Sequence, residues 1–155
     1  MNYSSLLTIH SWFRWVVLIS LMITIGRAWF GRRNKLTFTT FDNKLRHMTA
    51  SICHIQLVLG LWLYFISPIV NYFLNNFGEA VHLREIRFFG MEHITVMIIA
   101  ILVITIGSMK AKRKHTDREK FNTIYVWYSV GLLLILSSIP WSFSPLTSRP
   151  LFRVF

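Results

Sequence analysis

Four long stretches of apolar residues are the feature that most constrains how this chain can fold. A helix needs about 20 mostly apolar residues to cross the hydrocarbon core of a bilayer. Stretches of that length occupy about residues 6–30, 42–67, 85–110 and 117–139. Because a helix satisfies its own backbone hydrogen bonds in lipid, the sequence predicts an all-α integral membrane four-helix bundle, with one domain over residues 1–155.

The composition agrees with this class. Hydrophobic residues make up 54% of the chain and charged residues only 15%, which is far from the balance of a soluble domain. The formal net charge of +11 could suggest nucleic acid. However, the basic residues lie in short loops between apolar stretches and form no continuous face, so we expect a lipid bilayer and no nucleic acid as partner.

The positions of lysine and arginine predict the orientation of the helices. Six of these residues lie in residues 27–46 and six in residues 109–120. Basic loops of this length are retained in the cytoplasm. Both termini are therefore predicted on the opposite, outer side of the membrane. The same loops could also bind anionic headgroups or an acidic partner.

A short internal repeat adds to this organisation. The segment Ile-Thr-Ile-Gly occurs at residues 23–26 and again at 104–107, each time before a basic loop. The helix after each loop contains a glycine and ends at Pro68 or Pro140. The pattern predicts two parallel helical hairpins related by an axis along the membrane normal.

Ionisable side chains inside a membrane are costly and point to a functional role. His10 and Arg14 lie in the first predicted span and His93 lies in the third. Both histidines lie about one to two turns from the outer ends of their helices, at about 3.6 residues per turn. Two axial ligands of one haem must meet its iron at the same level, and imidazole is a standard axial ligand. His10 and His93 are therefore the predicted iron ligands.

His54 should lie deeper than this pair. About 13 residues, or about 20 Å of helix, separate it from the outer end of its span. It shares one helix face with His47 and Ser51, at i, i+4, i+7 spacing. Residues 117–139 contain no histidine to complete a second haem site. We expect one haem, with His54 as a quinone contact or an alternative ligand.

Other roles for these side chains stay open at this point. Arg14 lies one turn beyond His10 and could pair with a haem propionate or with Glu92. Each histidine could instead hydrogen-bond a backbone carbonyl or a serine between packed helices. Met91 and Met97 flank His93, and thioethers with imidazole suit cuprous ions.

Several segments together carry a resemblance to a known family. They are Leu-Thr-Ile-His-Ser-Trp-Phe-Arg-Trp at 7–15, Ala-Ser-Ile-Cys-His-Ile-Gln-Leu at 50–57, Arg-Phe-Phe-Gly-Met-Glu-His at 87–93 and Ile-Pro-Trp at 139–141. They resemble the small four-helix bacterial membrane proteins usually labelled cytochrome b, over nearly the whole chain. The resemblance implies a b-type haem, a role in respiratory electron transfer and a bacterial inner (cytoplasmic) membrane location with periplasmic termini. The matching histidines are His10, His54 and His93.

More distantly, the architecture is similar to that of the copper-resistance D proteins and of the small haem-binding membrane protoporphyrinogen oxidases. The chain lacks an obvious counterpart of the helix-three lysine of those oxidases, which argues against their activity.

The combined expectation is an electron-transfer protein rather than a stand-alone enzyme. It would hold one haem b between His10 and His93, with Arg14 and His54 as further cofactor-binding residues. Quinone or quinol and other respiratory membrane subunits are the expected partners, and a homo-oligomer is a candidate assembly. The alternatives are a haem-free scaffold subunit of a larger membrane complex and a metal or small-solute transporter.

Overall fold

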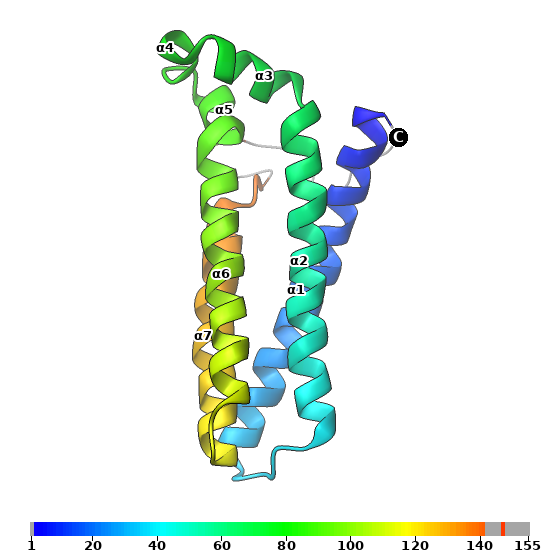
Figure 1. Ribbon diagram of the computed structural model, residues 1–155, viewed down its shortest axis with the longest axis vertical. Helices are drawn as coiled ribbons and strands as arrows, with labels where there is room; N and C mark the ends of the chain where they lie inside the picture. Colours follow the sequence, from blue (N-terminus) through cyan, green and yellow to red (C-terminus); the bar gives the residue numbers. More distant parts are fainter. Residues whose placement is uncertain (1, 142–146, 148–155) are drawn as a thin grey trace.

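The computed structural model describes residues 2–141 and residue 147, and the predicted apolar stretches form four long helical spans (Figure 1). The spans are α1 (Tyr3–Arg33), α2 (Thr40–Ile66), the run of α5 (Arg84–Arg87), η1 (Phe88–Glu92) and α6 (His93–Lys112), and α7 (Asp117–Ser138). Each span is long and apolar enough to cross a bilayer. For the described residues, the prediction of an all-α bundle with four helices able to span a membrane is confirmed.

Local capping determines where the spans begin. The Asn2 side chain accepts a hydrogen bond from the Ser5 amide at 2.9 Å, so α1 starts earlier than its apolar stretch. Thr39 and Asp42 cap α2 reciprocally, and Thr116 and Glu119 do the same for α7. The two basic loops therefore both end in a capping box, which fits the predicted pair of hairpins.

The connection between the second and third spans contains two short helices that the sequence did not predict. They are α3 (Pro68–Asn75) and α4 (Phe77–Ala80). Pro68 occupies the first turn of α3, where its missing N–H costs nothing, and the Ser67 side chain caps that turn. The apolar side of α3 buries Val70 and Phe73. As a result α3 lies across one end of the bundle (Figure 1).

The spans form a four-helix arrangement in which each helix has two neighbours. The α1–α2 and α6–α7 pairs make two hairpins, and the hairpins meet through α1 with α7 and α2 with α6. Consequently α1 and α6 stand on one diagonal of the bundle and α2 and α7 on the other. Side chains from α1 and α6 can therefore face each other across the interior.

The interior is filled in one half and hollow in the other. The packed half lies toward the basic loops and contains fully buried Leu21, Cys53, Ile104 and Tyr128. Polar groups in this half bond across helices, as between the Thr24 and Thr49 hydroxyls at 2.7 Å. Such interhelical bonds are expected where no water competes.

The outer surface of the spans is apolar. Ile19, Val58, Leu102 and Leu133, one from each span, are 55% to 66% exposed. A continuous apolar surface of this kind marks a surface that contacts lipid. The chain is accordingly a multi-pass membrane protein.

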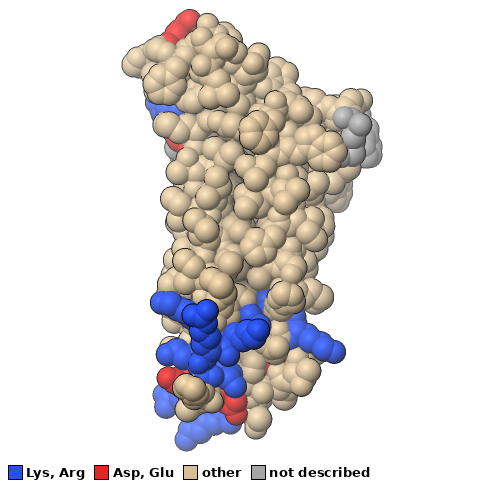
Figure 2. All heavy atoms as spheres, in the orientation of Figure 1, with Lys and Arg blue, Asp and Glu red and all other residues tan. Residues whose placement is uncertain are grey.

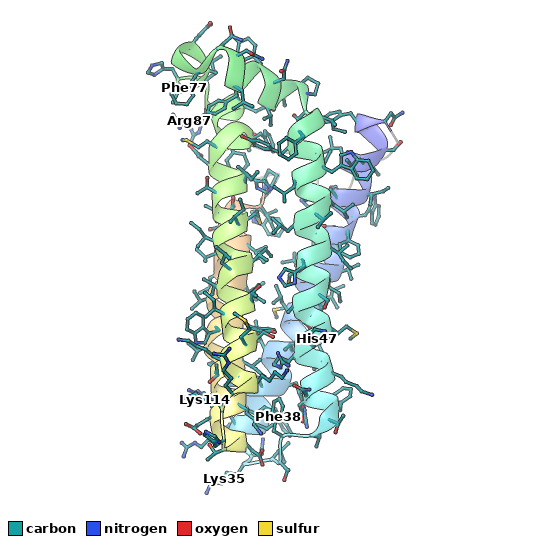
Figure 3. The ribbon with its side chains drawn as sticks, in the orientation of Figure 1. Lys35, Phe38, His47, Phe77, Arg87 and Lys114 are labelled. Carbon is teal, nitrogen blue, oxygen red and sulfur yellow. The ribbon has the colours of Figure 1, made fainter. Side chains whose placement is uncertain are left out.

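The charges gather at one end of the bundle. Lys and Arg cover the end that carries the two short loops after α1 and α6 (Figure 2). Figure 3 places Lys35 and Lys114 at this end and Arg87 at the other. α1 begins, and α7 ends, away from the basic loops. The C-terminal tail, also predicted on that side, falls outside the described residues after Trp141, apart from residue 147.

Candidate cofactor site

A cavity of about 390 Å³ occupies the half of the bundle away from the basic loops. Its volume lies within the range typical of small-molecule and cofactor sites. Most of its wall is apolar and includes Leu7, Leu57 and Met97. Polar side chains converge on it from three spans: His10, Ser11, Arg14, Gln56, Tyr64 and His93. The cavity is therefore an apolar chamber with a small set of placed polar groups.

His10 of α1 lies against α2. A Cβ atom at Gly60 would come within 3.1 Å of the His10 Cε1 atom, so the missing side chain at Gly60 makes room for the imidazole ring. The Gln56 amide donates to the His10 carbonyl at 3.0 Å, and its nitrogen is 3.4 Å from His10 Nε2. Because an amide nitrogen can only donate, Nε2 accepts here and the ring proton belongs on Nδ1.

This arrangement leaves two polar atoms unsatisfied. His10 Nδ1 and Gln56 Oε1 are both buried without a hydrogen-bond partner among the described residues. A buried polar atom without a partner costs about 1–3 kcal/mol, so such atoms are rare and call for an explanation. Both residues line the cavity, so the contact between His10 and Gln56 leaves one polar atom of each without a partner in the cavity wall.

His93 is fixed by the last turn of α7. Its Nδ1 atom lies 2.7 Å from the Ser138 carbonyl oxygen. A carbonyl only accepts, so Nδ1 donates and Nε2 carries the lone pair. A histidine that binds a metal through Nε2 usually makes this second-shell hydrogen bond from Nδ1. Packing against Phe88 and Phe89, at ring-centroid distances of 5.7 and 6.3 Å, further restricts the imidazole.

A π-helical turn directly precedes His93. This turn is η1, where the helix widens and its carbonyls no longer accept the hydrogen bonds of an ordinary α-helix. The Tyr64 hydroxyl donates to the carbonyl of Gly90 at 2.9 Å. Phe73 of α3 packs so close to Gly90 that a Cβ atom there would overlap its ring at 2.3 Å. Helix α2 and helix α3 thus hold the turn that sets the direction of His93.

Arg14 lies one turn beyond His10 on α1 and lines the same cavity. Its guanidinium carbon lies 5.3 Å from the centre of the Trp15 ring. Glu92, the partner that the sequence also offered to Arg14, accepts a 2.6 Å hydrogen bond from Arg87. The cavity therefore contains a cationic group beside its two imidazoles.

His54 does not line the cavity. Its Nε2 atom lies 2.9 Å from the Thr105 hydroxyl, and that hydroxyl donates to the Ile101 carbonyl at 2.7 Å. The hydroxyl proton is therefore engaged, so His54 Nε2 donates to Thr105. His47 is exposed in the half that carries the basic loops (Figure 3). The structure brings together His10, Arg14 and His93, and it places His54 elsewhere.

Three groups that contribute to the site were not predicted from the sequence. Gln56, Tyr64 and the Ser138 carbonyl were not singled out, although Gln56 lies inside a segment that carried the family resemblance. A polar amide in an apolar span was a usable signal for Gln56. No local pattern marks the other two, because each acts on a residue that is distant along the chain.

Comparisons with known proteins identify no relative of this chain. No protein-family model matches it, and neither the curated proteins nor the solved structures include one that matches.

Proposed function

We propose that this chain binds one haem b between His10 and His93 and serves in respiratory electron transfer. One observation carries the proposal. The two histidines come from diagonally opposed helices, and both line a single cavity in the half of the bundle away from the basic loops. Two imidazoles that line one apolar chamber supply a donor set suited to a b-type haem.

The residues present fit such a group. The Ser138 carbonyl holds His93 in the tautomer that leaves Nε2 available. For His10, ligation through Nε2 would replace its 3.4 Å contact with Gln56. Arg14 lines the same cavity and would offer a positive charge to an anionic propionate. When bound, the haem supplies a reversible one-electron centre, and its axial ligands and burial set the potential.

The orientation of the protein follows from its charges. We place the basic end in the cytoplasm of a bacterium and the cavity near the outer, periplasmic surface of its inner membrane. Quinol in the bilayer is the proposed electron donor, and each quinol oxidised would release two electrons and two protons. Other respiratory membrane subunits are the proposed onward partners.

An absorption spectrum tests the haem directly. Protein purified from haem-replete cells is expected to show the reduced α and Soret bands of a low-spin b haem. His10→Ala and His93→Ala should each abolish these bands, because each removes one axial ligand. His54→Ala is the matched control, since it removes a membrane histidine outside the cavity. That variant should keep the wild-type spectrum.

Two outcomes would contradict the proposal. A colourless wild-type preparation that is monodisperse and fully helical by circular dichroism would favour the haem-free scaffold. Loss of the bands in His54→Ala, with retention in His10→Ala, would place the haem elsewhere in the bundle.

A further inference from the structure

A second pocket lies at the basic end of the bundle, remote from the haem cavity. Its volume is about 290 Å³, and its lining consists of one indole and four cationic side chains: Trp29, Arg32, Arg33, Lys35 and Arg118. These residues come from the last turns of α1, the loop after it and the first turn of α7. No acidic side chain lines this basic pocket within the described part of the chain.

Acidic residues near the basic pocket are engaged elsewhere. Asp117 lies 4.0 Å from Lys120, and Glu119 lies 3.6 Å from Lys114. Asp42 binds Arg27 at 2.7 Å. The positive charge of the four lining residues is therefore not balanced by a carboxylate in the pocket wall. Such a concentration of cations favours an anionic ligand.

Two of the three arginines of the basic pocket, Arg32 and Arg33, contact neighbouring side chains. The Arg32 Nη1 atom donates to the Asn122 side-chain oxygen at 2.8 Å, and its guanidinium lies 4.6 Å from the Tyr125 ring centre. The Arg33 guanidinium lies 5.6 Å from the Trp29 ring centre. A topology signal needs only charge near the membrane. Fixed guanidinium groups are in addition preorganised for a ligand, which lowers the entropy lost on binding.

The backbone conformation of Lys35 also favours an anion-binding role for the basic pocket. Its φ angle is +52°, in the left-handed region that favours glycine. It follows the C-cap of α1, and the next amide, of Leu36, donates back to the Gly31 carbonyl at 3.0 Å. Glycine is the usual residue at this position of a helix C-terminus. A lysine there accepts backbone strain and adds a cation to the pocket.

The position of the basic pocket identifies the source of the anion. Trp29 is 43% exposed at the edge of the apolar surface, where indoles anchor to the headgroup region. Met22, seven residues earlier on the same helix face, is 61% exposed and extends an apolar path along α1 from the pocket. We propose that the basic pocket binds the phosphate of an anionic phospholipid, whose acyl chains follow this face of α1.

Lipid nanodiscs test this site on the full-length protein. We expect phosphatidylglycerol, added to phosphatidylcholine discs, to raise the thermal midpoint of the wild type and to be retained in native mass spectra. Arg32→Gln with Arg118→Gln should lower the retained phosphatidylglycerol by about tenfold or more for each arginine, because a hydrogen bond from a charged donor to the phosphate contributes about 1.5 kcal/mol or more. Lys112→Gln with Arg113→Gln is the matched control, with the same charge loss at the same end outside the pocket. Its loss of lipid should be clearly smaller than that of the pocket pair, because it removes only the general attraction of a basic surface for anionic lipid.

A second variant separates binding from folding. Lys35→Gly removes both the strain and one cation, so it should raise the thermal midpoint in pure phosphatidylcholine discs while weakening the response to phosphatidylglycerol. A lower midpoint in phosphatidylcholine would overturn the strain argument.

Two further results would overturn the lipid site. Equal losses in the pocket and control pairs would reduce the effect to general attraction by a basic surface. Full stabilisation by inorganic phosphate in zwitterionic micelles would show a site for the free anion. Neither result depends on whether the protein binds haem.

Discussion

Two glycines in identical sequence contexts have different surroundings in this protein. Gly26 and Gly107 each end an Ile-Thr-Ile-Gly segment. Among the described residues, no atom beyond the adjacent backbone of its own helix lies within 4 Å of the place where a Cβ would stand at Gly26. At Gly107 that position is 2.2 Å from the Trp127 Cβ atom. The difference arises because Gly107 faces the neighbouring helix α7 and Gly26 faces outward. The repeat therefore marks corresponding positions along two hairpins, and the contacts of the two glycines are not repeated.

Replacement of each glycine by alanine should change the free energy of unfolding differently at the two positions. Gly107→Ala forces Trp127 and α7 to shift, and overpacking of this kind costs about 1–3 kcal/mol. Gly26→Ala adds a methyl group in open space and removes backbone freedom, so it should be neutral or stabilising by up to about 1 kcal/mol. Unfolding in mixed micelles with increasing dodecyl sulfate measures both free energies. Equal costs at the two positions would contradict the packing seen around Gly107.

The histidines show which residue-level features can be predicted from sequence. The cost of an ionisable group in lipid drew attention to the intramembrane histidines, and their depth along the helices then paired His10 with His93. Their hydrogen-bond partners could not be found in this way. Gln56 is 46 residues from His10, and the Ser138 carbonyl is 45 residues from His93. Such hydrogen-bonded pairs depend on the packing of the whole bundle, so a local sequence pattern cannot predict them.

At the scale of elements, the π-helical turn is the feature that the sequence pattern did not predict. Apolar residues recur through residues 85–110 as in an ordinary helix, and an extra residue in one turn does not disturb that pattern enough to be noticed. π-bulges inside α-helices frequently lie at functional sites. Here the turn ends at His93. Contacts from Tyr64 and Phe73 stabilise the widened turn from outside the helix.

Removal of the Tyr64 hydroxyl tests this support. Tyr64→Phe keeps the ring but leaves the Gly90 carbonyl without its 2.9 Å donor. Amide protection across residues 88–93 should fall by about five- to tenfold, which corresponds to the loss of one hydrogen bond. Hydrogen–deuterium exchange with mass spectrometry reports this change whether or not haem is present.

The control for this change is Tyr125→Phe. The ring of Tyr125 packs on Arg32 at the opposite end of the bundle, and that contact does not need the hydroxyl. Exchange across residues 88–93 should stay at the wild-type level in this variant. Unchanged exchange in Tyr64→Phe would show that the turn holds without this hydrogen bond.

At the scale of the whole molecule, the number and ends of the spans were predictable and the division of the interior was not. The length of an apolar stretch is a strong signal because lipid accepts little else. It located all four spans to within a few residues, although capping by Asn2 and Thr39 moved two of the starts. The cavity depends on how α1, α2, α6, α7 and the short helix α3 pack around it, since all five contribute residues to its wall. Apolar content is similar along the spans, so it contains no sign of this difference.

The charge asymmetry predicts how the molecule lies in the membrane, and single cysteines can measure it. The native Cys53 is fully buried, so the wild type should not react with a membrane-impermeant maleimide. Ser4 is exposed at the start of α1, and Lys114 is exposed in the second basic loop at the opposite end. Because basic loops stay in the cytoplasm, Ser4→Cys should label in intact spheroplasts and Lys114→Cys only after lysis. The reverse pattern would place the cavity lined by His10 and His93 on the cytoplasmic side and the basic pocket on the outer one. Labelling of both positions in intact spheroplasts would show a mixed orientation, which a charge difference this large should prevent.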